Sequence, residues 1–241
     1  MTADPVSPLI VVATHHKTGT VWMQQLFLEI CSEQGLEFFQ GDQDALPARA
    51  HVFLQEHSRV DFSALPRPYR GIHLIRDPRD VLISGAHYHR RSSEAWLHVR
   101  RLRFYGLTYQ EAIRTCRSLA DAVAFEMRHS GGHTIREMLS WSYSNPLMYE
   151  VKYEDLVDDA GMARLVEIFS FLGYPQDVLA ELMTIARRVS IFHDGVDCLG
   201  HARDGRARQW TQVFDRRLKD LFLKRFDDAL IRLGYEQNHD W

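Results

Sequence analysis

The sequence has few cysteines, and none of them are close together. Its three cysteines, Cys31, Cys116 and Cys198, are spread over 241 residues, and no Cys-x-x-Cys motif occurs. This excludes the disulfide framework of a small secreted domain. A chain of this length buries about 70–75% of the surface that its unfolded form exposes, so it needs no disulfide bond to fold. We therefore expect reduced thiols and a cytoplasmic location.

Long hydrophobic runs are also missing. The N-terminal region has no basic segment, and its apolar run Leu9–Ala13 is too short for a signal peptide. No apolar stretch approaches the roughly 20 residues that cross a bilayer as a helix. We therefore expect no membrane span.

No excess of positive charge is present. The formal charge is 29 − 32 = −3, which argues against a dedicated nucleic-acid-binding protein. Residues 86–117 are locally basic, with seven arginines against two acidic residues. This segment is either a solvated helix face or a lid that attracts an anionic acceptor or donor.

Two strand–loop–helix units are present instead. Leu9–Thr14 is an unbroken apolar run, and a helical pattern follows over Val21–Glu33. Ile72–Ile75 is a second run, followed by Asp77 as a helix N-cap, Pro78 in the first turn and a helix to His89. Further strands are predicted at Leu147–Val151 and Ala50–Leu54. Alternating strands and helices predict an α/β fold, with a mostly parallel sheet that carries helices on both faces.

The rest of the chain is mostly helical in pattern. A polar-rich helical zone spans Ser92–Tyr143, with predicted breaks at Gly106 and at Gly131-Gly132. Three more helices are predicted at Gly161–Leu172, Gln176–Arg188 and Arg216–Leu233. A loop is predicted at Gly195–Gln209. Because no repeat or linker interrupts the chain, we expect residues 1–241 to form a single domain.

The loop after the first strand is suited to an anion. Backbone N–H groups at a helix N-terminus point outward, and the helix dipole favours negative charge. Lys17 adds a positive charge, and Gly19 allows close approach of the backbone. The loop is not a Walker A motif, because His16 and Val11 stand where that motif has glycines.

Several segments resemble signatures of the cytosolic-type sulfotransferases. The sequence His16-Lys17-Thr18-Gly19-Thr20-Val21-Trp22 resembles that family's Pro-Lys-Ser-Gly-Thr-Thr-Trp loop. The pair Arg76 and Ser84, eight residues apart, resembles its second signature. Similarities continue, in the family's order, at Tyr153-Glu154-Asp155-Leu156, at Arg203-Asp204-Gly205 with Trp210, and at the closing helix before Leu233-Gly234-Tyr235. The resemblance implies a P-loop-related fold, similar to that of the nucleotide kinases.

The resemblance also implies a donor, 3′-phosphoadenosine 5′-phosphosulfate (PAPS), and residues that hold it. The 5′-phosphosulfate would be held by Lys17, Thr18, Gly19, Thr20 and Val21. The adenine would stack on Trp22 beside Tyr153, with Ser190 and Phe192 completing its pocket. The 3′-phosphate would be held by Arg76, Ser84, Arg203 and the Gly205 backbone. Asp204 stands where the family usually has lysine, so Arg206 or Arg208 would have to replace that charge.

An acceptor hydroxyl needs a general base, and histidine is the usual choice near neutral pH. The family's base lies in a Thr-His turn, and the segment Gln55-Glu56-His57-Ser58 occupies that region. We therefore predict His57 as the base and Lys17 as the second catalytic residue. His15 and His16 are competing bases because they lie in the donor loop, and His51 is a further candidate.

No metal site is expected. The pairs His129/His133 and His87/His89 lack the further convergent ligands that zinc needs. The acceptor remains open among small molecules, saccharides and lipids, and so does the oligomeric state. Two alternatives also remain: a small-molecule kinase of related topology, and a non-catalytic anion-binding module.

Overall fold

The structure is a computed structural model that describes residues 8–190 and 205–241. Phe192 and Arg203, two of the expected donor-binding residues, lie outside these ranges. The chain divides into two compact units, Met1–Ile75 with Trp141–Gly205 and Arg76–Ser140 with Arg206–Trp241. Within the described ranges, no helix is long and apolar enough to cross a membrane.

The first unit is built on a five-stranded parallel sheet. Its strands are β1 (Leu9–Ala13), β2 (Phe38–Gln40), β3 (Val52–Gln55), β4 (Tyr69–Ile75) and β5 (Met148–Lys152). They lie in the order β2-β3-β1-β4-β5, and every pairing is parallel. The four predicted strands are confirmed. The sequence analysis missed β2, which has only three residues, all half-buried.

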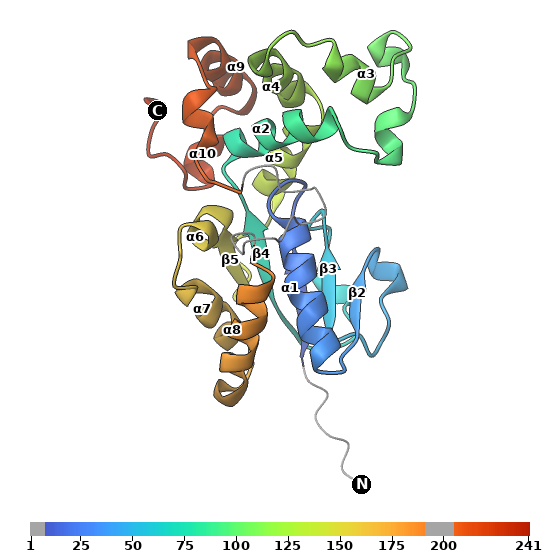
Figure 1. Cartoon of the computed structure of the whole chain (residues 1–241), viewed down its shortest axis with the longest axis vertical. Coiled ribbons are helices and arrows are strands. Elements are labelled where there is room, and N and C mark those ends of the chain that lie inside the picture. Colours follow the sequence, from blue (N-terminus) through green and yellow to red (C-terminus); the bar gives the residue numbers. More distant parts are fainter. Residues whose placement is uncertain (1–7, 191–204) are drawn as a thin grey trace. The chain divides into compact units, whose positions relative to one another are not determined.

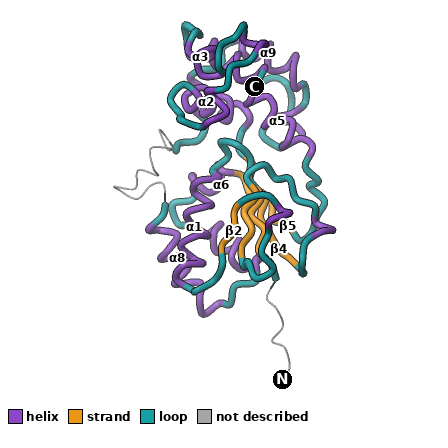
Figure 2. Tube along the Cα trace, turned by 90° about the vertical axis from the view of Figure 1, so that its right-hand side faces the viewer, coloured by secondary structure: helices purple, strands orange, loops and turns teal. Residues whose placement is uncertain are grey.

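The sheet is buried because its strands are apolar on both faces. On one face Ile10, Val12 and their neighbours pack against α1 (Thr20–Glu33), α7 (Ala163–Leu172) and α8 (Leu179–Arg188). Figure 2 shows α1 and α8 on the same side of the orange strands. On the other face, Leu9, Val11 and Ala13 pack in one cluster with aromatic side chains from strands and from connecting segments. This alternation is expected of a strand with two buried faces.

Short elements complete the first unit. Helix α6 (Tyr153–Val157) directly follows β5, and the 3₁₀ turns are η1 (Gln43–Ala45), η2 (Phe62–Ala64) and η5 (Gln176–Val178). The predicted helix Gln176–Arg188 therefore begins as the 3₁₀ turn η5 and becomes α-helical at Leu179. Figure 1 shows these elements from blue to orange along the chain.

The second unit is helical. Its helices are α2 (Pro78–His89), α3 (Tyr109–Arg114), α4 (Leu119–Arg128), α5 (Ser130–Ser140), α9 (Arg216–Phe226) and α10 (Ala229–Arg232), with 3₁₀ turns η3 (Ala95–His98), η4 (Leu102–Phe104) and η6 (Gln209–Gln212). The predicted N-cap of α2 is confirmed, because the Asp77 side chain accepts the Arg79 backbone N–H.

Two predicted helix boundaries in this unit are wrong. The zone after Ser92 breaks at His129, and Gly131 and Gly132 lie inside α5. These glycines serve close packing, since a Cβ on Gly132 would lie 2.2 Å from the Met127 carbonyl oxygen. The predicted helix Arg216–Leu233 is split at Asp227, whose φ of 44° leaves the helical region.

Candidate functional site

The loop between β1 and α1 is folded around the backbone of His15. The His15 carbonyl accepts the Thr18 hydroxyl at 2.8 Å and the Thr20 hydroxyl at 3.0 Å. The His15 N–H donates to the Thr18 hydroxyl oxygen at 3.0 Å. The Thr14 and Thr20 hydroxyls are hydrogen-bonded at 2.9 Å. Side-chain hydroxyls thus fix a tight turn directly before the helix, where the sequence predicted an anion-binding loop.

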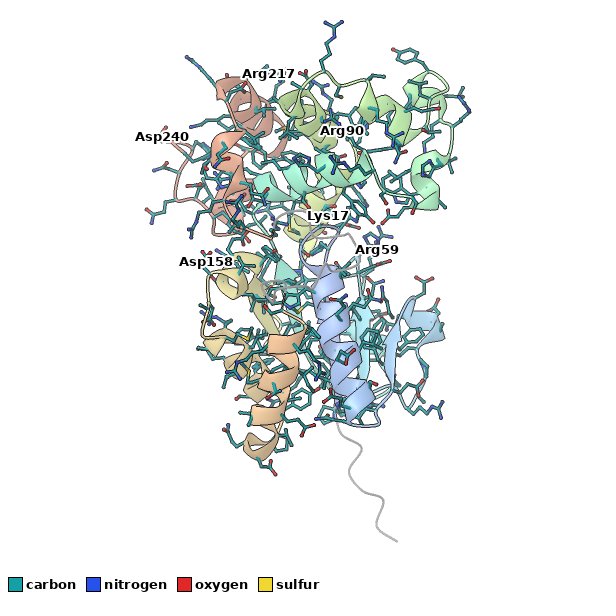
Figure 3. All side chains as sticks on the ribbon, viewed as in Figure 1. Lys17, Arg59, Arg90, Asp158, Arg217 and Asp240 are labelled. Atoms are coloured by element: carbon teal, nitrogen blue, oxygen red, sulfur yellow. The ribbon has the colours of Figure 1, made fainter. Side chains whose placement is uncertain are left out.

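Two residues of this loop adopt left-handed backbone conformations. Lys17 has φ 67°, and Gly19, the N-cap of α1, has φ 114°. In the described part of the chain no side chain caps this helix, and its first turn has no acidic residue. Its first N–H groups and the positive end of its dipole therefore suit an anion. Figure 3 labels Lys17, which precedes this helix.

We predict that Gly19→Ala destabilises the protein by about 1–3 kcal/mol, because the left-handed backbone strains any residue with a Cβ. The added Cβ would also lie 3.1 Å from the Tyr153 ring and 3.2 Å from Leu74. Urea denaturation measures the loss. Gly35→Ala is the matched control, because Gly35 also has a positive φ, of 65°, but a Cβ added there would meet no atom within 4 Å. Equal losses would mean that contact with Tyr153 and Leu74 contributes nothing.

The turn after β3 is joined to the Thr14–Thr20 loop, the predicted donor loop. The Gln55 side-chain oxygen accepts the His57 N–H at 2.8 Å, so the side chain of the last residue of β3 shapes this turn. The Ser58 hydroxyl donates to the Thr14 carbonyl oxygen at 2.9 Å. Strands β1 and β3 are neighbours, with Ala13 paired to Gln55. The half-buried His57 therefore lies in a turn that is hydrogen-bonded to the loop of Lys17.

The other candidate bases are distributed differently. His16 is half-buried in the donor loop, whereas His15 is fully buried. His51 precedes β3, at the opposite end of that strand from His57, and its ring contacts Tyr174 edge-on. Burial lowers the pKa of His51, and the nearby positive charge of Arg67 lowers it further. The structure therefore separates His51 from the carboxyl ends of the strands, where the donor loop lies.

A cavity opens beside the first helix. It has a volume of about 280 Å³ and is lined by Trp22, Leu156, Val157, Asp159, Ala160, Met162, Leu165 and Ser190. Two of the predicted adenine-contacting residues, Trp22 and Ser190, thus line one cavity. Tyr153 contacts Trp22 edge-on, with ring centroids 6.3 Å apart. The buried Trp22 indole N–H has no hydrogen-bond partner within residues 8–190 and 205–241, so a ligand atom could accept it.

Two predicted 3′-phosphate residues belong to the second unit. Arg76 directly follows β4 in the chain and is buried, and Ser84 is half-buried in the second turn of α2. The Arg76 guanidinium lies 4.0 Å from the Asp80 carboxylate. Burial raises the pKa of Asp80, while the charge of Arg76 lowers it. Arg76 is thus held at the start of α2 by an acidic neighbour.

The segment after Gly205 has its own anchors. In the first unit, the Tyr153 hydroxyl donates to the Gly205 carbonyl oxygen at 2.8 Å. In the second unit, the Trp210 N–H donates to Asp80 at 2.9 Å. The guanidinium of Arg79 stacks 3.5 Å from the Trp210 ring and 4.7 Å from the Trp241 ring. These contacts fix the backbone on the C-terminal side of the predicted phosphate-binding loop.

One polar cluster in the first unit, centred on the buried His73, is not predicted by the sequence. His73 lies in β4 between apolar residues, and it contacts His15, Glu150 and Trp141. A lone histidine inside an apolar strand was the available signal.

Metal ligands do not come together in the described residues: no group of three or more His, Cys, Asp or Glu side chains there could hold an ion.

Comparisons with known proteins concern the family and the fold of this chain. A family profile described as "Sulfotransferase domain" matches residues 7–194. The crystal structure of mouse sulfotransferase SULT7A1 complexed with PAP is similar, with a TM-score of 0.63, 17% identity, and coverage of 97% of this chain and 90% of that one. The crystal structure of retinol dehydratase in complex with androsterone and inactive cofactor PAP has a TM-score of 0.52, 19% identity, and coverage of 94% and 82%. At these identities both similarities concern the fold. No curated protein matches.

Proposed function

This chain belongs to the sulfotransferase domain family, and we propose that it transfers a sulfuryl group from PAPS to a hydroxyl group of an acceptor. The observation that carries the proposal is the loop after β1, with left-handed Lys17 and Gly19 before an uncapped helix N-terminus. Such a loop offers backbone N–H groups and one ammonium group to an anion.

The residues of the first unit fit the donor. Lys17, Thr18, Gly19, Thr20 and Val21 would hold its 5′-phosphosulfate. The cavity beside Trp22 and Ser190 has mostly apolar walls, which suit an adenine ring, and the Trp22 indole N–H, which has no partner among the described residues, could donate to a ligand. For the 3′-phosphate, we propose Arg76 and Ser84 of the second unit, the Gly205 backbone, and Arg203 outside the described residues.

Catalysis would rest on positioning and on charge stabilisation, by analogy with phosphoryl transfer. The donor supplies the sulfuryl group and leaves as adenosine 3′,5′-bisphosphate (PAP). His57 would accept the proton of the acceptor hydroxyl as its oxygen bonds to sulfur. Lys17 would stabilise the negative charge on the phosphate oxygen whose bond to sulfur breaks. We propose no metal ion in this step, because Lys17 and the helix N-terminus supply the positive charge.

The acceptor is proposed by chemical class only. A neutral imidazole base suits a hydroxyl better than an amine, which is already protonated at neutral pH. Small molecules, saccharides and lipid headgroups all carry such hydroxyls. The basic segment 86–117 would favour an anionic member of these classes.

Two organisational proposals accompany the activity. We propose that residues 1–241 act as one sulfotransferase domain, since the family match at 7–194 includes parts of both units. We also propose a cytoplasmic location. Cys31 and Cys116 are free thiols, and burial raises the pKa of Cys31 to about 12, which keeps it protonated and unreactive.

We predict that PAP raises the melting temperature without magnesium, and that AMP does so much less. A ligand at 100 times its Kd stabilises the folded state by about 2.7 kcal/mol. AMP lacks the 3′-phosphate that Arg76 and Ser84 would bind. Thermal-shift measurements with PAP, AMP and ATP–Mg²⁺ test this. Equal shifts from PAP and ATP–Mg²⁺ would favour a kinase, and no shift with PAP would contradict the proposed donor.

A further inference from the structure

A chain of polar side chains runs across the sheet of the first unit, from the partly exposed Glu150 through the buried His73 to the buried His15 of the Thr14–Thr20 loop. The His73 Nδ1 atom lies 2.6 Å from the Glu150 carboxylate, and the His73 Nε2 atom lies 2.8 Å from the His15 Nε2 atom. The Trp141 indole N–H donates to the other Glu150 oxygen at 2.9 Å. The Trp141 ring also stacks on His73, with centroids 4.0 Å apart.

Strand register creates this chain. In the parallel sheet, His73 of β4 is paired with Ala13 of β1 on one side and with Glu150 of β5 on the other. Paired residues place their side chains on the same face of a sheet. Because His15 is two residues beyond Ala13, the polar row extends from β5 through β4 to the first residues of the donor loop.

The hydrogen bonds assign the protons. The Glu150 carboxylate only accepts, so His73 donates to it through Nδ1. Burial lowers the pKa of His73 more than hydrogen bonding to Glu150 and its negative charge raise it, which favours a neutral ring. A neutral ring has one N–H, so the His73 Nε2 atom accepts the His15 Nε2–H. The His15 ring therefore carries a proton on Nε2.

The anchored ring belongs to the residue whose backbone organises the loop. The same His15 carbonyl accepts both the Thr18 and the Thr20 hydroxyls. Its ring is fully buried, as is the ring of His73. Loss of the anchor would therefore release the residue on which the turn before α1 is folded.

We propose that His73 and Glu150 are positioning residues for sulfuryl transfer: through His15 they hold the Thr14–Thr20 loop in the conformation that binds the 5′ end of the donor. This inference rests on the proposed function for the identity of the donor. The proton assignment is independent of that function and can be measured without any ligand.

Glu150→Gln tests the chain with little change of volume. The Trp141 N–H needs an acceptor, so the amide oxygen would face it and the amide NH₂ would face His73. His73 would then accept on Nδ1 and donate from Nε2, and the His15 proton would move to Nδ1. ¹⁵N NMR of the imidazole rings distinguishes these tautomers. We expect the wild-type pattern to reverse in E150Q.

PAP affinity, measured by calorimetry, tests the positioning role. We expect His73→Phe, which removes the anchor, to weaken PAP binding about 10- to 100-fold, the range for losing a strong hydrogen bond. E150Q should weaken it less, because His15 remains bonded. Glu167→Gln is the matched control. Glu167 lies in the same unit and accepts the Tyr149 hydroxyl, but it has no part in the row from Glu150 to His15. The PAP affinity of the E167Q protein should equal that of the wild type.

The outcomes separate the two ideas. If wild-type protein binds PAP and both H73F and E150Q bind it equally well, the inference is overturned and the proposed function stands. Unreversed tautomers in a folded E150Q protein would also overturn it, even if H73F did not fold. If wild-type protein does not bind PAP, the donor assignment fails and the positioning role fails with it.

Discussion

His57→Ala should lower kcat for sulfuryl transfer about 10²–10⁴-fold, as is typical when a general base is removed. His57 lies in the turn after β3, and the Ser58 hydroxyl ties that turn to the Thr14 carbonyl of the donor loop. His57 is half-buried, so it keeps part of its surface exposed to solvent. The measurement is single-turnover transfer from radiolabelled PAPS to an acceptor found by screening.

Three comparisons make the His57 result specific. PAP affinity of His57→Ala should equal that of wild type, because His57 would face the acceptor and not the nucleotide. His16→Ala is the matched control, since it removes another half-buried imidazole from the same unit. Lys17→Ala should weaken donor binding as well as turnover. Full activity of His57→Ala with an inactive His16→Ala would move the base to the donor loop.

Arg76→Ala should weaken PAP binding by about 1.5–3 kcal/mol, the range for a hydrogen bond to a charged group. The Arg76 guanidinium is buried at the start of α2. Water could not easily take its place there, so a bound 3′-phosphate would lose its partner. AMP binding should hardly change, because AMP lacks the 3′-phosphate. Calorimetric titration of both nucleotides gives the two affinities.

A matched arginine controls for general loss of charge. Arg70 lies near the start of β4, at the other end of that strand, and donates to the Phe171 carbonyl oxygen. Arg70→Ala should leave both affinities unchanged. If Arg76→Ala weakens PAP and AMP equally, Arg76 acts through its ion pair with Asp80 and does not contact the 3′-phosphate.

Local patterns predicted much of the first unit and the start of α2 in the second. The apolar runs at Leu9 and Ile72 are long enough to define buried strands, and each is followed by a turn with clear chemistry. Pro78 and Asp77 predicted the start of α2 because helix-start signals depend on neighbouring residues alone. The turn between β1 and α1 was predictable for the same reason: Gly19 and Lys17 lie within a few residues of the strand and the helix that they connect.

Other boundaries depend on packing. The break after α4 falls at His129, and the glycines that seemed to mark it instead allow α5 to approach Met127 and Leu82. The strand β2 has three residues, which is too few for a periodic pattern. Asp227 interrupts an amphipathic pattern that continues on both sides of it.

The sequence by itself determined that an apolar strand leads into a tight turn with Lys17 and Gly19 before a helix, and that an arginine, a serine and a histidine follow later strands. These features are local, so the chain order of residues is sufficient to specify them. Only the tertiary structure decided that β1 lies between β3 and β4, and therefore that Ser58 contacts Thr14 and that His15, His73 and Glu150 form one chain. Such contacts depend on strand order and register, which are set by the free energy of packing the whole sheet and by no short segment of sequence.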